Sequence, residues 1–354
     1  MNRLSIDNWI KPEVRKQPAY TLKKVPYQIK LNQNECPWDW PEELKEEILD
    51  RLRNTSWNRY PELIPQRLRE NLAVYLGITF AQVVVGKGSN ELLQALAMVS
   101  LGPGDVLCTL SPTFANYHLL GERMQARVVA VPLTRNFQLD TDAFLDKCSN
   151  ARLTFLCNPN SPTGTLIPLE VIQQITKCTS GILVVDEAYV DFSGLTALAL
   201  IGEHPNLAIT RTFSKAFALA GFRIGYAVMH PLLAEEVQKG LLPYNIDTPS
   251  LITAEVLLQH REKVKERVAV IVGERRRLLG HLAGLPGVQV WDSAANFFLL
   301  STPIGAQGTF GALAEKGILV RDVSAYPGCE NVVRVTVGTP EENSALLAAV
   351  EALC

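Results

Sequence analysis

The sequence carries almost no surplus of either charge. Its 34 lysines and arginines are nearly balanced by 36 aspartates and glutamates, so the formal net charge is −2. A protein that binds nucleic acid or an anionic membrane mainly by electrostatics carries a clear positive surplus. We therefore expect neither a nucleic acid nor a membrane as a partner, whereas small charged ligands remain open.

Long apolar runs and a secretion signal are also lacking. All apolar stretches are much shorter than the roughly 18 residues that a membrane-spanning helix needs. Residues 1–20 mix acidic and basic side chains and contain no apolar segment of the kind that a secretory signal requires. The seven cysteines are scattered, with no C-x-x-C pair and no histidine at zinc-ligand spacing. We therefore expect no metal site, and a reducing, cytoplasmic location.

The rest of the composition is typical of a globular protein. Hydrophobic residues make up 47% and charged residues 20% of the 354 positions, which disfavours disorder and suggests about two domains. Short β-branched runs predict strands at 83–85, 106–110, 127–131, 153–157, 182–185, 208–210 and 225–229. Predicted helices lie between them at 90–100, 114–124, 168–177 and 214–220. This alternation predicts an α/β fold with a mostly parallel seven-stranded sheet flanked by helices.

The pattern changes after residue 243. A long helix is predicted at 248–282, followed by strands at 288–290, 296–300, 318–321 and 332–337 and helices at 309–316 and 340–353. These elements predict a smaller α+β domain. The expected division is an N-terminal segment at 1–30, which packs with the small domain and the substrate site, a large domain at 31–245 and a small domain at 246–354.

Three junctions after predicted strands carry unusual residues. The first is V-V-V-G-K-G-S-N-E at 83–91, where two glycines relax the backbone before Ser89 and Asn90 open a helix. The unpaired N–H groups and positive end of that helix form a candidate phosphate cradle. Glycine followed by serine and asparagine is more commonly a simple helix cap, and that alternative stays open here.

The second junction is I-L-V-V-D-E-A-Y at 182–189, where a buried strand runs directly into Asp186. Burying this carboxylate is costly unless it meets a cation. The alternatives are a helix cap and a magnesium-holding aspartate. A magnesium-holding aspartate of this kind is usually accompanied by the phosphate-binding loop G-x-x-x-x-G-K-[ST]. The glycine-rich run at 83–91 does not match that loop, which disfavours the magnesium alternative.

The third junction is R-T-F-S-K-A-F-A-L-A-G-F-R at 211–223, which places Lys215 among small and apolar residues. Desolvation there should lower the pKa of the amine, as a nucleophile that forms an imine requires. The alternative is a lysine that extends to the surface. An imine-forming lysine, a phosphate cradle supplemented by Ser214 and Arg223, and a buried acid together match the needs of pyridoxal phosphate.

Further motifs extend along almost the whole chain: P-A-Y at 18–20, L-N-Q-N-E at 31–35, N-R-Y-P-E at 58–62, S-P-T-F at 111–114, C-N-P-N-S-P-T-G at 157–164 and V-R-V-T-V-G at 333–338. With the three junctions, they resemble the fold-type I pyridoxal-phosphate-dependent aminotransferases, and within these the histidinol-phosphate branch. The combined set is highly specific for the superfamily and less so for the branch.

The resemblance implies a role for each matching residue. Lys215 would bind the cofactor aldehyde and then move a proton between substrate and cofactor carbons. Asp186 would pair with the ring nitrogen and Tyr189 with the phenolic oxygen. The remaining implied cofactor contacts are Phe114, stacking on the ring, Asn160, and the phosphate-side residues Ser89, Asn90, Thr212, Ser214, Arg223 and Tyr60, the last from the partner subunit of a homodimer.

Two positions depart from the family pattern. Phe114 stands where tyrosine is common, so ring stacking survives without the hydroxyl. Ser161 stands where the family usually has an asparagine that bonds the phenolic oxygen, so that contact passes to Asn160, to Ser161 or mainly to Tyr189.

The resemblance also implies the substrates. Arg334 would hold a carboxylate of glutamate or 2-oxoglutarate, and the positions matching the phosphate of the amine donor are Tyr20, Asn34, Arg321 and Arg334. For Arg321, an ion pair with Asp322 is the structural alternative. The expected reaction converts histidinol phosphate and 2-oxoglutarate into imidazole-acetol phosphate and glutamate, in histidine biosynthesis.

Other functions remain open on the same scaffold. An aromatic amino-acid aminotransferase would differ in only a few pocket contacts, and a threonine-phosphate decarboxylase would also bind a phosphorylated amine. A pyridoxal-phosphate-binding regulatory module without turnover is disfavoured, because no basic segment precedes Tyr20 that could form a DNA-binding domain.

Overall fold

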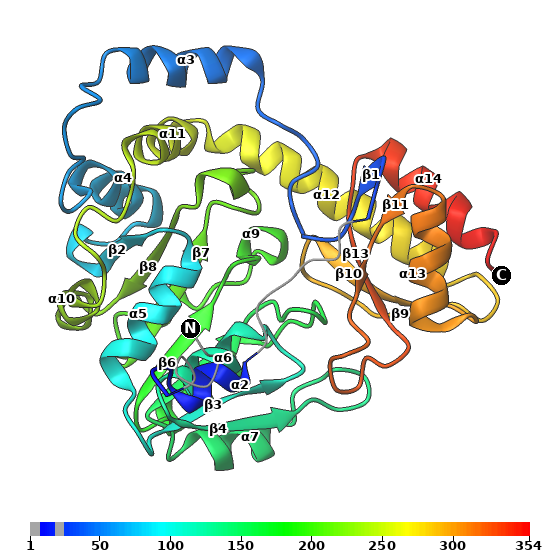
Figure 1. The fold of residues 1–354 in the computed structure, drawn as a ribbon, viewed down its shortest axis with the longest axis horizontal. Coiled ribbons are helices and arrows are strands. Elements are labelled where there is room, and N and C mark those ends of the chain that lie inside the picture. Colours follow the sequence, from blue (N-terminus) through cyan, green and yellow to red (C-terminus); the bar gives the residue numbers. More distant parts are fainter. Residues whose placement is uncertain (1–7, 18–24) are drawn as a thin grey trace.

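Two sheets form the framework of the molecule. The computed structural model describes residues 8–17 and 25–354, and places a large helix-flanked sheet beside a smaller one (Figure 1). In spatial order the large sheet contains β2 (Val83–Gly86), β8 (Gly225–Met229), β7 (Leu207–Thr212), β6 (Ile182–Asp186), β5 (Leu153–Cys157), β3 (Val106–Ser111) and β4 (Arg127–Pro132). Strand β8 is antiparallel to both neighbours, and the other paired strands are parallel. The predicted α/β fold is confirmed.

Successive residues of each strand face opposite sides of this sheet. On β2, Val84 joins one apolar cluster, whereas Val83 and Val85 join the other. The first face is covered by α5 (Ser89–Ser100), α6 (Asn116–Arg123) and α10 (Pro231–Lys239). The second cluster includes residues of α4 (Gln66–Leu76), α7 (Thr141–Cys148), α8 (Leu169–Cys178) and α11 (Thr248–Gln259). It extends to α3 (Glu42–Arg53), which packs on α11, and to α12 (Arg261–Leu282), which packs on α9 (Val190–Ser193) and α14 (Pro340–Glu351). Burial on both faces explains why β5, β6 and β7 are mostly apolar.

The smaller domain is built on an antiparallel sheet of order β12, β13, β10, β9. Its elements are β9 (Gln289–Val290), β10 (Phe297–Ser301), β12 (Arg321–Asp322), β13 (Val333–Thr336), α13 (Gly305–Glu315) and α14 (Pro340–Glu351). Strand β1 (Ile29–Lys30) pairs in parallel with β11 (Ile318–Leu319), so an early part of the chain joins this domain (Figure 1). The domain boundaries at 30 and 245 stay predictions.

Five short helical elements complete the described fold: α2 (Pro12–Lys16), α9 (Val190–Ser193) and the 3-10 turns Phe80–Gln82, Leu198–Leu200 and Ala220–Phe222. Helix α2 lies against α6, where Gln17 Nε2 donates to Glu122 Oε2 at 2.9 Å. Among the described residues, we find no helix with the length and apolar content needed to cross a membrane.

The predicted helix at 248–282 is two helices, α11 and α12. His260 lies between them with φ of −96° and ψ of 26°, outside the helical region, and its Nε2 is 3.2 Å from Glu47 Oε2 on α3. The apolar periodicity continues through the break, so the sequence does not reveal it. The predicted strand at 318–321 is likewise divided, because Ile318 and Leu319 pair with β1 whereas Arg321 pairs with β13.

The predicted helix at 214–220 is wrong. The segment is a compact turn in which the backbone N–H of Leu219 donates to Phe213 O at 3.0 Å, and Ala218 and Arg223 have left-handed φ angles of 54° and 51°. Phe217 in this segment and Phe213 directly before it are both buried, which imitates a helical apolar face. The turn brings Ser214 and Arg223 together, which a helix would not do.

The core packing of α12 yields a test of stability. Ile271 is 0% exposed, whereas Val270 beside it is 45% exposed. We expect Ile271→Ala to lower the free energy of unfolding by ~2–5 kcal/mol, because it leaves a cavity in the core. Val270→Ala should change it by less than ~0.5 kcal/mol. Urea unfolding measures both, and equal losses would contradict the packing described here.

Candidate active site

The residues predicted to cradle a phosphate meet where β2 and β7 end and β8 begins. Gly225 of β8 pairs with Gly86 and with Thr212, and a Cβ at Gly225 would lie 2.6 Å from the Ser89 backbone nitrogen. Only glycine therefore lets the start of α5 approach the sheet so closely. Gly88 has a φ of 77°, and a Cβ there would lie 2.9 Å from Arg223 Nη2. Two glycines thus bring a helix N-terminus and a guanidinium side by side.

The donors of this cradle face one another. Helix α5 has no side-chain cap hydrogen bond, so its first N–H groups remain available to an anion. Arg223 Nη1 donates to Ser214 Oγ at 3.1 Å, and the Ser214 backbone N–H donates to Thr212 Oγ1 at 3.1 Å. Asn90 is exposed on the first turn of the helix. The structure therefore brings the cradle predicted from separate motifs to one place.

Asp186 lies at the carboxyl end of the central strand β6 and is 3% exposed. Tyr117 donates its hydroxyl to Oδ2 at 2.7 Å, and Thr210 donates to Oδ1 at 3.0 Å. Burial raises the pKa of Asp186, while these hydrogen bonds act in the opposite direction. Sequence reasoning missed both partners. Tyr117 lies three residues after Phe114 in a predicted helix, a spacing that could have placed them on one side.

Lys215 lies in the turn between β7 and β8 and is partly buried. Its Nζ donates to the backbone oxygen of Gln33 at 2.9 Å and lies 5.8 Å from the Tyr189 ring centroid. Burial lowers the pKa of the amine to about 7, and the positive charges of Arg334 and Arg223 contribute in the same direction. The amine is therefore partly uncharged at neutral pH, as its predicted role requires.

Tyr189 connects the large sheet to the smaller domain. Its hydroxyl accepts a hydrogen bond from Asn34 Nδ2 at 3.0 Å, and Asn34 Oδ1 accepts one from Thr336 Oγ1 of β13 at 3.1 Å. Asn34 is 1% exposed and has a left-handed φ of 56°. Much of the polar capacity of its side chain is thus used inside the protein rather than directed at a ligand.

Asn160 and Ser161 have different surroundings. Asn160 Nδ2 donates to Pro112 O at 3.0 Å and to Thr163 Oγ1 at 2.9 Å, and its Oδ1 accepts from Thr113 at 2.7 Å. Both amide hydrogens are therefore used within neighbouring loops. Ser161 Oγ instead accepts from Arg334 Nη1 at 3.3 Å and also interacts with Tyr189.

Arg321 and Arg334 lie directly opposite each other on the antiparallel strands β12 and β13. Opposed residues of such a pair project from the same face of the sheet, and two like charges there disfavour folding. Arg334 Nη2 donates to Asn32 O at 3.0 Å, and its guanidinium lies 5.1 Å from the Phe297 ring centroid. Among the described residues, Asp322 forms no ion pair with Arg321, since it binds Gln307 and the Ser324 backbone.

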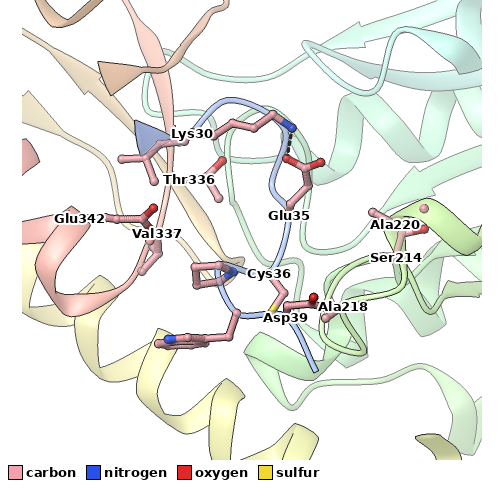
Figure 2. Close-up of a pocket in the computed structure, with 15 residues that line it drawn as sticks. Lys30, Glu35, Cys36, Asp39, Ser214, Ala218, Ala220, Thr336, Val337 and Glu342 are labelled. Atoms are coloured by element: carbon pink, nitrogen blue, oxygen red, sulfur yellow. Dashed lines mark hydrogen bonds and ion pairs between the residues drawn. The ribbon is translucent and has the colours of Figure 1, made fainter. Parts of the chain in front are cut away.

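A cavity of about 380 Å³ opens beside the lysine turn (Figure 2). Its walls come from three parts of the chain: the segment containing Glu35, the turn with Ser214, and the start of α14. Lys30 and Glu35 form an ion pair on its rim. The cavity therefore lies between the two domains and reaches Ser214 of the cradle, whereas Lys215 and Asp186 do not line it.

Of the predicted site residues, Tyr60 is not part of this cluster, and Tyr20 lies outside the described residues. Tyr60 is 81% exposed in the segment between α3 and α4, where its ring stacks on Tyr244 at 4.7 Å between centroids. Phe114 is partly buried and contacts the Tyr117 ring edge to face at 5.5 Å.

Comparisons with known proteins agree with this geometry. A family model described as aminotransferase class I and II matches residues 26–350. Histidinol-phosphate aminotransferases of Prosthecochloris aestuarii and Chlorobium limicola are each 39% identical, over 96% and 92% of both chains respectively. A crystal structure of the Sinorhizobium meliloti histidinol-phosphate aminotransferase, in complex with pyridoxal-5'-phosphate, superposes with a TM-score of 0.87 at 24% identity, covering 97% of both chains. The structural likeness supports the fold.

The electrostatics of Lys215 can be tested on the amine itself. We expect Arg334→Gln to raise the pKa of Lys215, because a positive charge that disfavours the protonated amine is removed. The pH profile of reductive methylation at Lys215, followed by mass spectrometry, should then shift to higher pH. Arg277→Gln, which removes a surface charge paired with Glu274, is the control. An unshifted profile in Arg334→Gln would contradict the coupling.

Proposed function

The chain belongs to the aminotransferase class I and II family, and we propose that it is a pyridoxal-phosphate-dependent histidinol-phosphate aminotransferase. In this proposal it transfers the amino group of histidinol phosphate to 2-oxoglutarate, giving imidazole-acetol phosphate and glutamate, a step of histidine biosynthesis. The names of the relatives support the substrate, and the residues of the site support the chemistry.

The donor set fits pyridoxal phosphate. The start of α5, Ser214 and Arg223 offer hydrogen bonds to a phosphate in a cradle that only glycines at 88 and 225 allow. Asp186 offers a buried carboxylate for a protonated ring nitrogen, and Lys215 offers an amine for the aldehyde. When bound, the cofactor supplies an electron sink that stabilises negative charge on the substrate carbon.

In this proposal the chain's own residues transfer a proton at the Lys215 amine and stabilise one on the cofactor ring nitrogen. The Lys215 amine, with a pKa of about 7, can both accept and donate a proton at Nζ near neutral pH. Asp186 favours a proton on the ring nitrogen while it remains ionised. In this proposal Tyr189 and Ser161 bond the phenolic oxygen. We assign this second contact to Ser161 rather than Asn160, whose amide hydrogens are already used.

The two opposed arginines, Arg321 and Arg334, are the observation that favours histidinol phosphate as the substrate. An aromatic amino acid has one anionic group, which a single guanidinium satisfies. Histidinol phosphate brings a doubly charged phosphate, which compensates two guanidiniums on one face of the sheet. In the other half of the reaction, 2-oxoglutarate also carries two negative charges. Arg321 and Arg334 therefore match the charges of both proposed substrates.

A substrate panel tests this proposal. With 2-oxoglutarate as acceptor, we expect a larger kcat/KM for histidinol phosphate than for phenylalanine. Arg321→Gln should lower kcat/KM for histidinol phosphate about 10- to 100-fold, because a charge-assisted contact is lost, and should affect phenylalanine less. Exposed Arg135 provides the control Arg135→Gln.

Three results would contradict the proposed function. Preference for phenylalanine would identify an aromatic aminotransferase, carbon dioxide release from threonine phosphate would identify a decarboxylase, and cofactor binding without turnover of any amine would identify a regulatory module.

We further propose that the enzyme is a cytoplasmic homodimer in which Tyr60 reaches the phosphate cradle of the partner subunit. Trp57 and Tyr60 are 83% and 81% exposed, and the stacked pair of Tyr60 and Tyr244 is partly open to solvent. Exposed aromatic clusters of this kind are typical of interfaces. All seven cysteines are unpaired, which is consistent with a reducing compartment.

Subunit mixing tests the contribution of Tyr60. Lys215→Ala should be inactive and Tyr60→Ala strongly impaired. If Tyr60 acts across the interface, dissociating and reassociating the two variants together restores one complete site in each mixed dimer. Roughly a quarter of normal activity should then return, since about half of the random dimers are mixed. No recovery in dimers shown to be mixed would contradict the proposal.

A further inference from the structure

Tyr117 is a fully buried polar side chain that contacts two residues of the candidate site, Asp186 and Phe114. It lies on α6 at 0% exposure, and its ring stacks on Phe155 of β5 at 4.8 Å between centroids, with planes 22° apart. The ring also contacts the Phe114 ring edge to face, with 5.5 Å between the ring centroids and 85° between the ring planes. Its hydroxyl is 2.7 Å from Asp186 Oδ2. One side chain thus touches both the predicted stacking residue and the predicted partner of the ring nitrogen.

The direction of this hydrogen bond is determined by the two acidities. Burial raises the pKa of Tyr117 well above its ordinary value, and the neighbouring charge of Asp186 adds to the effect. The phenol therefore keeps its proton and donates it to the carboxylate. Such a bond stabilises the ionised form of Asp186 against the cost of burial.

The carboxylate has room for one more donor. An ionised carboxylate offers about four lone-pair positions. Tyr117, Thr210 and the Ala188 backbone amide supply donors to Asp186. The other ionisable groups around it are Cys157 of β5 and Glu187, and Glu187 is neutralised by Arg211 at 2.8 Å. A protonated ring nitrogen would therefore complete the surroundings of Asp186.

We propose that Tyr117 is a positioning residue that keeps Asp186 ionised and directed at the cofactor ring nitrogen, and that its edge-to-face contact helps to hold the ring of Phe114. This inference rests on the proposed function, because it requires pyridoxal phosphate in the site. Without the Tyr117 hydroxyl, Asp186 tends to take up the proton that it otherwise holds on the ring nitrogen. The electron sink then weakens, although substrate contacts remain intact.

Tyr117→Phe isolates this role, because it removes the hydroxyl and keeps the aromatic packing. In protein loaded with ¹⁵N-labelled pyridoxal phosphate, the ring-nitrogen signal should move toward that of a neutral pyridine. We expect the dissociation constant of the cofactor to rise, and kcat to fall, by about tenfold or more, with KM for the amine donor nearly unchanged. Tyr226→Phe is the matched control, since its buried hydroxyl bonds Arg211 instead.

A folded Tyr117→Phe protein with an unmoved ring-nitrogen signal and normal cofactor affinity would overturn the inference. If this variant does not fold, 3-fluorotyrosine incorporated in a Tyr189→Phe background replaces it. Fluorine acidifies the phenol and strengthens its bond to Asp186, so the signal should move toward that of protonated pyridine, and no movement would overturn the inference.

The two proposals fail in different ways. A loaded wild-type protein with a protonated ring nitrogen but no turnover of histidinol phosphate would overturn the proposed function alone. Turnover of histidinol phosphate, with no effect of Tyr117→Phe on the ring-nitrogen signal, would overturn the role of Tyr117 alone.

Discussion

The cost of burying the Asp186 carboxylate is the constraint on which the rest of the site depends. An ionised carboxylate at the end of a central strand loses its hydration, and only donors placed around it can offset that loss. Thr210 on the neighbouring strand and Tyr117 on the covering helix provide such donors. The sheet order that makes β6 and β7 neighbours, and the packing of α6 on β5, are therefore conditions for the chemistry as well as for the core.

The same physical reasoning explains the basic side of the site. Arg223 and Arg334 lie within electrostatic reach of Lys215, so both guanidiniums disfavour the protonated form of its amine. Burial and mutual repulsion together lower the pKa of the lysine to about 7. The arrangement costs stability in the protein alone and becomes favourable when anionic groups occupy the cleft. A net charge close to zero conceals this local excess of positive charge.

The link between the two domains combines uncharged groups with one arginine. Asn34 bonds both Tyr189 beside the large sheet and Thr336 on β13, and it adopts a left-handed backbone angle to do so. Arg334 on the same strand reaches Ser161 in the loop after β5. The residues proposed to contact the cofactor ring and those proposed to contact the substrate therefore share one hydrogen-bonded network. Asn34 is buried within this network, and its expected contact with substrate stays a prediction.

The sequence by itself determined the strands, because a strand buried on both faces must be an apolar run. It also determined the main chemical groups, because an amine among apolar residues and an acid at a strand end each signal a ligand. It could not determine the break at His260, the turn at 214–220, the contact from Tyr117 to Asp186 or the register that opposes Arg321 and Arg334. Those depend on pairings between segments distant in the chain. Periodicity reports which face of an element is apolar, whereas only tertiary packing decides what that face meets.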